Sequence, residues 1–201
     1  MPIDTVDPGS EPPGGFAYAY KPSLMAAPWE FRLTDEGMDW SASGKSGHVP
    51  FRDVERISMT YKPASMQTHR FVTEIRARNA PKLTIVSSSW KGLVEQERFD
   101  RPYTIFITEL HRRLAQAGVD VQGTKGRSPL VYWPGVVVFA VVAVAMAAMT
   151  VHALQAGLFL AALFLGAFFL FFLWQSGNYF RRNRPGVYPV GTPPPDLMPK
   201  I

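Results

Sequence analysis

Hydrophobic and polar side chains alternate with a period of two residues over the first half of the chain. Residues 16–20, 29–33 and 69–77 are clear examples. This alternation is typical of strands that bury one face of a sheet. Similar short segments, separated by turn-forming residues, continue to residue 86. The sequence therefore predicts six or seven short antiparallel strands.

The period changes near residue 100. From there, apolar side chains recur at spacings of four and three residues, which places them on one face of a helix. These side chains are Tyr103, Ile107, Leu110, Leu114 and Ala117. Asp100 suits the N-cap of such a helix, and Gly118 suits its end. We therefore expect one amphipathic helix that packs its apolar face on the sheet.

A third pattern is a long apolar run. Residues 128–180 contain no Asp, Glu, Lys or Arg. One helix of this length would extend about 80 Å, against a hydrocarbon core of about 30 Å. Polar and flexible residues gather in the middle of the run, between Thr150 and Gly157, so we predict a turn there. The sequence therefore predicts two membrane-spanning helices, near 130–151 and 154–174.

The alternative is a pair of buried helices in a soluble protein. The second segment is apolar on every side, however, and the rest of the chain is too small to enclose it. We therefore favour a membrane hairpin.

The charges that flank the apolar run predict its orientation. Lys125 and Arg127 precede the first span, Arg181, Arg182 and Arg184 follow the second, and the turn between the spans has no fixed charge. The positive-inside rule then places both termini in the cytoplasm. The first 15 residues lack the basic start and apolar centre of a secretory signal. The absence of cysteine fits a reducing compartment. The predicted location is the inner (plasma) membrane of a bacterial cell.

These patterns predict five segments. They are a disordered N-terminal tail at 1–15, a β domain with its C-terminal helix at 16–118, a linker at 119–128, a transmembrane hairpin at 129–175, and a basic, Pro-rich cytoplasmic tail at 176–201.

Motifs for catalysis or cofactor binding are absent from the sequence. Gly44-Lys45-Ser46 matches the end of a phosphate-binding loop, but Asp39 replaces the first glycine of that motif and Pro50 replaces the helix that should follow. We interpret it as a strand connection. The four histidines lack metal-ligand spacing, and the serine run 87–89 is typical of a solvated edge or loop. We expect no enzyme activity, no metal and no cofactor.

The net charge of +5 is concentrated after the spans, where the tail can meet anionic head groups. This distribution does not favour nucleic-acid binding. A second basic group lies within the predicted β-hairpin of residues 69–89. The candidate contacts for anionic lipid or a partner are Arg70, Arg76, Arg78, Lys82, Arg181, Arg182 and Arg184. Glu74 lies among the first four of these residues, and it favours the interpretation of this group as an ordinary solvated sheet face rather than a binding site.

Small residues recur four apart in the spans, at Ala143 and Ala147 and at Ala162 and Gly166. Such pairs let helix backbones approach closely. They allow the two spans to pack together or two copies of the chain to form a homo-oligomer.

The order of the elements resembles a pleckstrin-homology-like (PH-like) domain. In that fold, a bent antiparallel sheet forms a small barrel or sandwich, and a C-terminal helix caps one open end. The whole chain resembles bacterial membrane proteins that pair a cytoplasmic PH-like domain with a transmembrane hairpin, and the Asn-Arg-Pro and Pro-rich ending resembles their tails. The resemblance covers residues 16–118 and implies an α+β fold. In PH domains, loops between the first strands bind inositol phosphates through basic residues. The corresponding loops here contain one basic residue, Lys21, and two acidic residues, Asp35 and Glu36, so the resemblance does not extend to phosphoinositide binding.

We therefore expect a non-enzymatic membrane protein that contacts membrane lipids and presents a PH-like domain as a scaffold or interaction module to a protein partner. The alternative is a membrane-tethered sensor or accessory subunit that binds lipid or a small apolar ligand in or beside the barrel.

Overall fold

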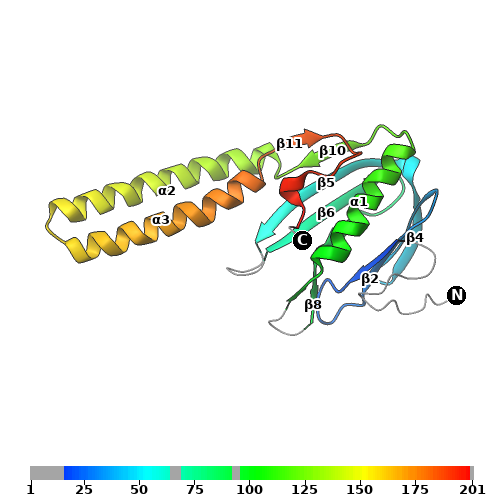
Figure 1. The fold of residues 1–201 in the computed structure, drawn as a ribbon, viewed down its shortest axis with the longest axis horizontal. Coiled ribbons are helices and arrows are strands. Elements are labelled where there is room, and N and C mark those ends of the chain that lie inside the picture. The colour runs from blue at the N-terminus through cyan, green and yellow to red at the C-terminus, as the bar shows by residue number, and fades with distance from the viewer. Residues whose placement is uncertain (1–15, 64–68, 92–95, 200–201) are drawn as a thin grey trace. The chain divides into compact units, whose positions relative to one another are not determined.

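The computed structural model describes residues 16–63, 69–91 and 96–199 (Figure 1). The predicted N-terminal tail, residues 1–15, lies outside this range. The chain forms two compact units. The first, here called the β-domain, combines the residues up to Lys125 with those from Gly186 onward. The second, here called the helical hairpin, spans Gly126–Pro185.

The first sheet of the β-domain is an antiparallel meander. Its strands, in spatial order, are β1 (Ala17–Tyr20), β2 (Trp29–Leu33), β3 (Gly37–Ala42) and β4 (Lys45–Pro50). Tyr18, Phe31 and Trp40 lie side by side in the register and are buried, as the alternation predicts. Ser43 and Gly44 both have positive φ in the turn from β3 to β4. This turn confirms the interpretation of Gly44-Lys45-Ser46 as a strand connection.

The second sheet contains five strands and uses residues from both ends of the chain. In spatial order they are β11 (Gly186–Tyr188), β10 (Gln122–Lys125), β5 (Val54–Pro63), β6 (His69–Ala77) and β7 (Leu83–Val86). Strand β10 runs parallel to β5, and the other neighbours are antiparallel. The smaller elements are β8 (Ser88–Trp90), β9 (Gln96–Arg98) and the 3₁₀ turns η1 (Phe51–Asp53) and η2 (Pro195–Leu197).

Helix α1 (Asp100–Gln116) contacts both sheets. The Phe106 ring packs against Tyr18 and Phe31 of the first sheet, and the Tyr103 hydroxyl lies 2.7 Å from Thr73 Oγ1 of the second. The predicted apolar face is buried except at Ala117, which follows the helix as its C-cap and is exposed. The core of the β-domain therefore lies between the two sheets and this helix.

The strands of the described residues form three separate sheets and no closed barrel. Side chains cover the open edge of β7. The Tyr18 hydroxyl donates to the Val86 carbonyl, and the Tyr20 hydroxyl donates to the Thr84 carbonyl, each at 2.6 Å. The two carbonyls are satisfied without a neighbouring strand, so β1 and β7 do not need a main-chain ladder. The protein is α+β, and of the predicted barrel or sandwich, a closed barrel is not found in the described part of the chain.

The helical hairpin is inserted between two paired strands of the β-domain. Gly123 pairs with Tyr188, and Lys125 pairs with Gly186. The segment 119–128, predicted as a linker, thus contributes β10, and the segment 176–201, predicted as one tail, is divided between the two units. Beyond β11, Pro194, Leu197 and Pro199 are buried in the β-domain.

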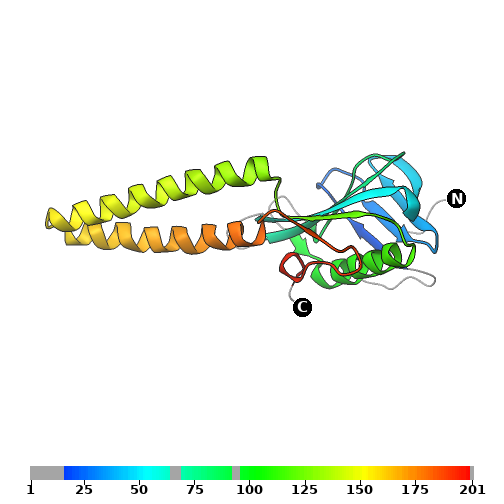
Figure 2. The same ribbon diagram turned by 90° about the horizontal axis from the view of Figure 1, so that it is seen from above.

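The helical hairpin consists of α2 (Pro129–Gln155) and α3 (Phe159–Arg182), which lie side by side in both views (Figures 1 and 2). Two helices of the predicted kind are confirmed, and both are long and apolar enough to cross a membrane. The turn lies at residues 156–158, where Gly157 has a φ of 71°.

Small residues form the contact between α2 and α3 near the turn, and aromatic rings form it nearer the base, where Phe139 packs against Phe172 and Phe180. Ala153 and Ala162 are buried, and Gly166 lies opposite the Thr150 methyl group. Ala143 and Ala147 are half-buried on the same helix as Ala153. Many other large apolar side chains are exposed, with Leu130 at 88% and Leu160 at 81% exposure. These exposed surfaces indicate association with a membrane.

The inserted arrangement predicts that the β-domain folds without the hairpin. We expect a variant in which an Asn-Gly turn replaces residues 126–185 to be soluble in detergent-free buffer and to unfold cooperatively, because Asn-Gly suits a tight connection between antiparallel strands. Solubility, circular dichroism and thermal unfolding would measure this. A chain that ends at Lys125 is the control, and it should unfold at lower temperature or aggregate because it lacks β11 and Leu197. Equal stability of the two variants would contradict the role given to the C-terminal residues.

Candidate functional site

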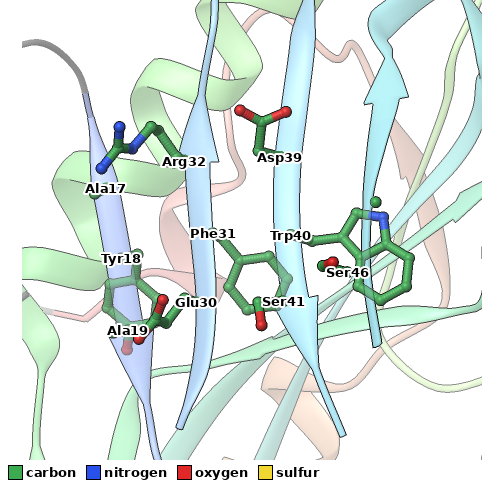
Figure 3. Close-up of a pocket in the computed structure, with 11 residues that line it drawn as sticks. Ala17, Tyr18, Ala19, Glu30, Phe31, Arg32, Asp39, Trp40, Ser41 and Ser46 are labelled. Atoms are coloured by element: carbon green, nitrogen blue, oxygen red, sulfur yellow. The ribbon is translucent and has the colours of Figure 1, made fainter. Parts of the chain in front are cut away.

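A hollow of about 370 Å³ lies on the outer face of the first sheet (Figure 3). Two rows of outward-facing residues border it. In the register, one row is Ala17, Arg32 and Asp39, and the other is Ala19, Glu30, Ser41 and Ser46. Between these rows lies the row of Tyr18, Phe31, Trp40 and Gly47, most of whose side chains point into the core. The hollow forms because small side chains stand next to charged ones on the same face.

Asp39, which borders the hollow, forms a close polar pair with His48. Such a pair could matter for catalysis if a nucleophile stood beside it. His48 Nδ1 lies 2.6 Å from Asp39 Oδ1, and both side chains are about half exposed. The other ring nitrogen lies over Gly37, because a Cβ there would be 2.8 Å from His48 Nε2. Ser46 lies two residues away in the opposite direction along β4. The histidine therefore does not point at this serine, and the pair links two neighbouring strands, because Asp39 stands opposite His48 in the register.

A buried polar cluster joins α1 to the C-terminal segment. His111 is 0% exposed, and its Nδ1 lies 2.7 Å from the Ile107 carbonyl. A carbonyl can only accept, so Nδ1 carries the proton and Nε2 accepts from the Tyr188 hydroxyl at 2.9 Å. Burial lowers the pKa of His111 to about 4 and raises the pKa of Tyr188. Both groups are neutral at pH 7, as suits an internal anchor for the C-terminal segment.

An ion-pair network holds the C-terminal half of α1 to the first sheet. Hydrogen bonds from Arg112 are the main reason why the pKa of the Glu109 carboxyl is lowered, with Arg113 adding to the effect. Arg113 also donates to the Thr34 carbonyl at 2.6 Å and lies over the Phe16 ring. All of these partners lie within the β-domain, so we assign the network a structural role in the fold.

In the predicted basic group of the β-domain, Arg70 and Arg76 lie on β6, and Arg78 and Lys82 lie in the connection from β6 to β7. Lys82 Nζ is 3.4 Å from Glu74, and Arg78 Nε is 3.5 Å from Glu55. Arg76 is exposed and stands directly opposite Arg56 in the register. Arg70 is half-buried on the same strand, opposite Lys62. Two of the four predicted cations therefore have a carboxylate neighbour, and a role for the group in binding stays a prediction.

The predicted basic group of the tail belongs to the helical hairpin. Arg181 and Arg182 end α3, and Arg184 follows two residues later. The structure adds Arg127, whose main-chain N–H donates to the Asn183 carbonyl at 3.0 Å. In the sequence analysis, Arg127 served only to orient the spans. The sequence pattern could not show that Arg127 lies next to the residues that follow α3.

The serine run 87–89 is buried, so its interpretation as a solvated edge or loop is wrong. Ser87 Oγ accepts from the Phe71 main-chain N–H at 2.9 Å, and Ser89 Oγ accepts from that of Lys21 at 3.0 Å. These bonds connect β8 and the residue before it to the two sheets. Across residues 16–63, 69–91 and 96–199, no three His, Cys, Asp or Glu side chains are grouped as a metal site would require.

Comparison with known proteins found no relative. No family model matches the chain, and neither curated proteins nor solved structures gave a match. Inferences about function therefore rest on the geometry described above.

The buried state of His111 predicts that acid destabilises the β-domain. Its folded pKa of about 4 lies below the usual 6.5, so its stabilising contribution is complete above pH 6.5 and is lost as the pH falls toward 4. Between pH 7 and about pH 5 we expect a loss of about 2 kcal/mol. Thermal unfolding followed by tryptophan fluorescence would measure it. His111→Gln should remove most of this pH dependence and His48→Gln should retain it, whereas equal slopes in all three proteins would contradict the assignment.

Proposed function

We propose that this protein is a non-enzymatic integral membrane protein that presents a PH-like domain to a protein partner at the cytoplasmic face of the bacterial inner membrane. The observation that carries the proposal is the helical hairpin. Its two helices are apolar on the surfaces that face away from each other, and only lipid solvates such surfaces well.

The pairing of β10 with β11 supports the proposed topology. Lys125 precedes the hairpin and Gly186 follows it, and these two residues face each other in one ladder. In this proposal, both ends of the hairpin lie on the same side of the membrane as the β-domain, in line with this pairing. The arginines at these ends favour the cytoplasmic side.

The order of the elements supports a PH-like assignment for the β-domain. A four-stranded meander is followed by the meander of β5, β6 and β7 and then by a helix that packs across both sheets. In our proposal, β10, β11 and the two tyrosine bonds at the edge of β7 are additions of this chain to that plan. The two tyrosines replace the ladder that would close a barrel.

The hollow on the first sheet supports a protein partner. Glu30, Arg32 and Asp39 give its border both signs of charge, and a polar, mixed-charge surface suits a reversible protein interface. Inside the β-domain, Ile57, Met59 and Ile85 are fully buried, so side chains occupy the space that an apolar ligand would need. The geometry favours a scaffold over a ligand-binding sensor.

Cysteine labelling would test the topology, since the natural chain has no cysteine. Ala156→Cys lies in the turn between the helices, and Lys45→Cys and Thr192→Cys lie on exposed parts of the β-domain. We expect a membrane-impermeant maleimide added to spheroplasts to label only Ala156→Cys, with all three labelled after lysis. Labelling of Lys45→Cys from outside would contradict the cytoplasmic position, and equal labelling of all three would contradict the hairpin.

Site-specific photocrosslinking would test the partner surface. A photoreactive residue in place of Ser41 should give a discrete protein adduct in native membranes, because Ser41 borders the hollow. Ala19→Trp should abolish the adduct by filling the hollow with an indole ring. The control position is Gln116, which is exposed at the end of α1. The absence of an adduct at Ser41, or the same adduct at Gln116, would contradict the proposed surface.

A further inference from the structure

All fixed charges of the helical hairpin lie at one end. Residues 126–185 contain four arginines and no Asp, Glu or Lys. Arg127 precedes α2, and Arg181, Arg182 and Arg184 lie at or just beyond the end of α3. This unit therefore concentrates positive charge without supplying a carboxylate to neutralise it.

The two chain segments that carry these arginines touch through their main chains. Arg127 N–H donates to the Asn183 carbonyl at 3.0 Å. Gly126 has a φ of 76°, and a Cβ at this residue would lie 2.4 Å from the carbonyl oxygens of both Asn183 and Arg184. Only glycine permits this approach. Arg127 and Arg184 are thus brought next to each other although the whole hairpin separates them in sequence.

The crossing is a fixed part of the unit. Asn183 is 0% exposed, and its side-chain amide donates to the Tyr179 carbonyl at 3.2 Å. This bond satisfies an acceptor in the last turn of α3 and holds the chain as it leaves the helix. The main chain that carries Arg182 and Arg184 is therefore held in place before any ligand binds.

Arg127 has an unused donor at this place. Its Nε is buried and makes no hydrogen bond to any of the described residues. A buried guanidinium N–H without an acceptor is unfavourable, and an anionic oxygen is its best partner. Arg184 next to it is exposed and can supply a second guanidinium group. Because their main chains lie side by side, the two forked donors can reach the oxygens of one phosphate group.

The surrounding side chains suit the level of lipid head groups. Tyr132 and Trp133 lie in the first turns of α2, and Tyr179 lies in the last turn of α3. Tyrosine and tryptophan are enriched where the hydrocarbon core meets the head groups. Phosphate esters of lipids are the abundant anions at this depth.

We infer that Arg127 and Arg184 form a binding site for the phosphate of an anionic phospholipid at the base of the helical hairpin, with Arg181 adding to the positive potential. This inference rests on the membrane location proposed above. The net positive charge of the site selects lipids without a compensating amine, such as phosphatidylglycerol, over phosphatidylcholine.

Native mass spectrometry of the full-length protein would test the site. The delipidated protein in detergent is titrated with phosphatidylglycerol or with phosphatidylcholine. We expect phosphatidylglycerol to bind about tenfold more tightly, in line with the attraction of a few basic residues for anionic lipid. Arg127→Gln with Arg184→Gln should remove this preference. The matched control, Arg52→Gln with Arg101→Gln, changes the net charge equally at exposed positions of the β-domain and should retain it.

Further measurements keep the test decisive. Arg184→Glu alone changes only an exposed side chain and should also abolish the preference, even if the double variant folds poorly. Soluble glycerol phosphate at equal concentration should not displace the lipid. Equal affinity for the two lipids, retained preference in Arg184→Glu, or full displacement by glycerol phosphate would each overturn the inference. A wild-type protein that stays monomeric without detergent would instead refute the membrane location itself.

Discussion

The pairing of β10 with β11 is the constraint on which the rest of the structure depends. It joins the residues before the helical hairpin to those after it, so the membrane segment becomes a loop of the β-domain. Leu197 and the Tyr188–His111 hydrogen bond then complete the core from the far end of the chain. A short ladder thus brings the two ends of the helical hairpin together and completes the core of the β-domain.

Local patterns predicted the elements that bury one face in a regular way. The alternation in residues 29–33 and 69–77 gave β2 and β6, and the spacing of four and three gave α1. The apolar run gave two helices because lipid solvates an uncharged helix on all sides. In each case a periodicity or a composition within one segment carries the information.

Contacts between distant segments could not be predicted in this way. Strand β10 has the sequence Gln-Gly-Thr-Lys, which alternates weakly, and its partner β11 lies beyond the hairpin. His111 looked isolated because Tyr188 is far away in sequence, and the serines at 87–89 looked solvated because their partners Phe71 and Lys21 lie on other strands. These bonds depend on the three-dimensional register.

The candidate sites show the same division. Composition identified the arginines that follow the spans, but their proximity to Arg127 comes from a main-chain hydrogen bond between two segments that the whole hairpin separates in sequence. The hollow of the first sheet arises because small residues of β1, β3 and β4 stand beside charged residues in register. No single stretch of sequence contains either arrangement.

The position of β11 also sets an order of events during synthesis. The ribosome completes both membrane helices before it releases Tyr188, Leu197 and their neighbours, so the soluble core stays open until the hairpin has been made. In the proposed topology, closure of the core then requires the nascent chain to return to the side from which it entered the bilayer. A chain whose second helix fails to cross back leaves an unpaired strand edge and a gap in its interior, which are features that proteases and chaperones recognise.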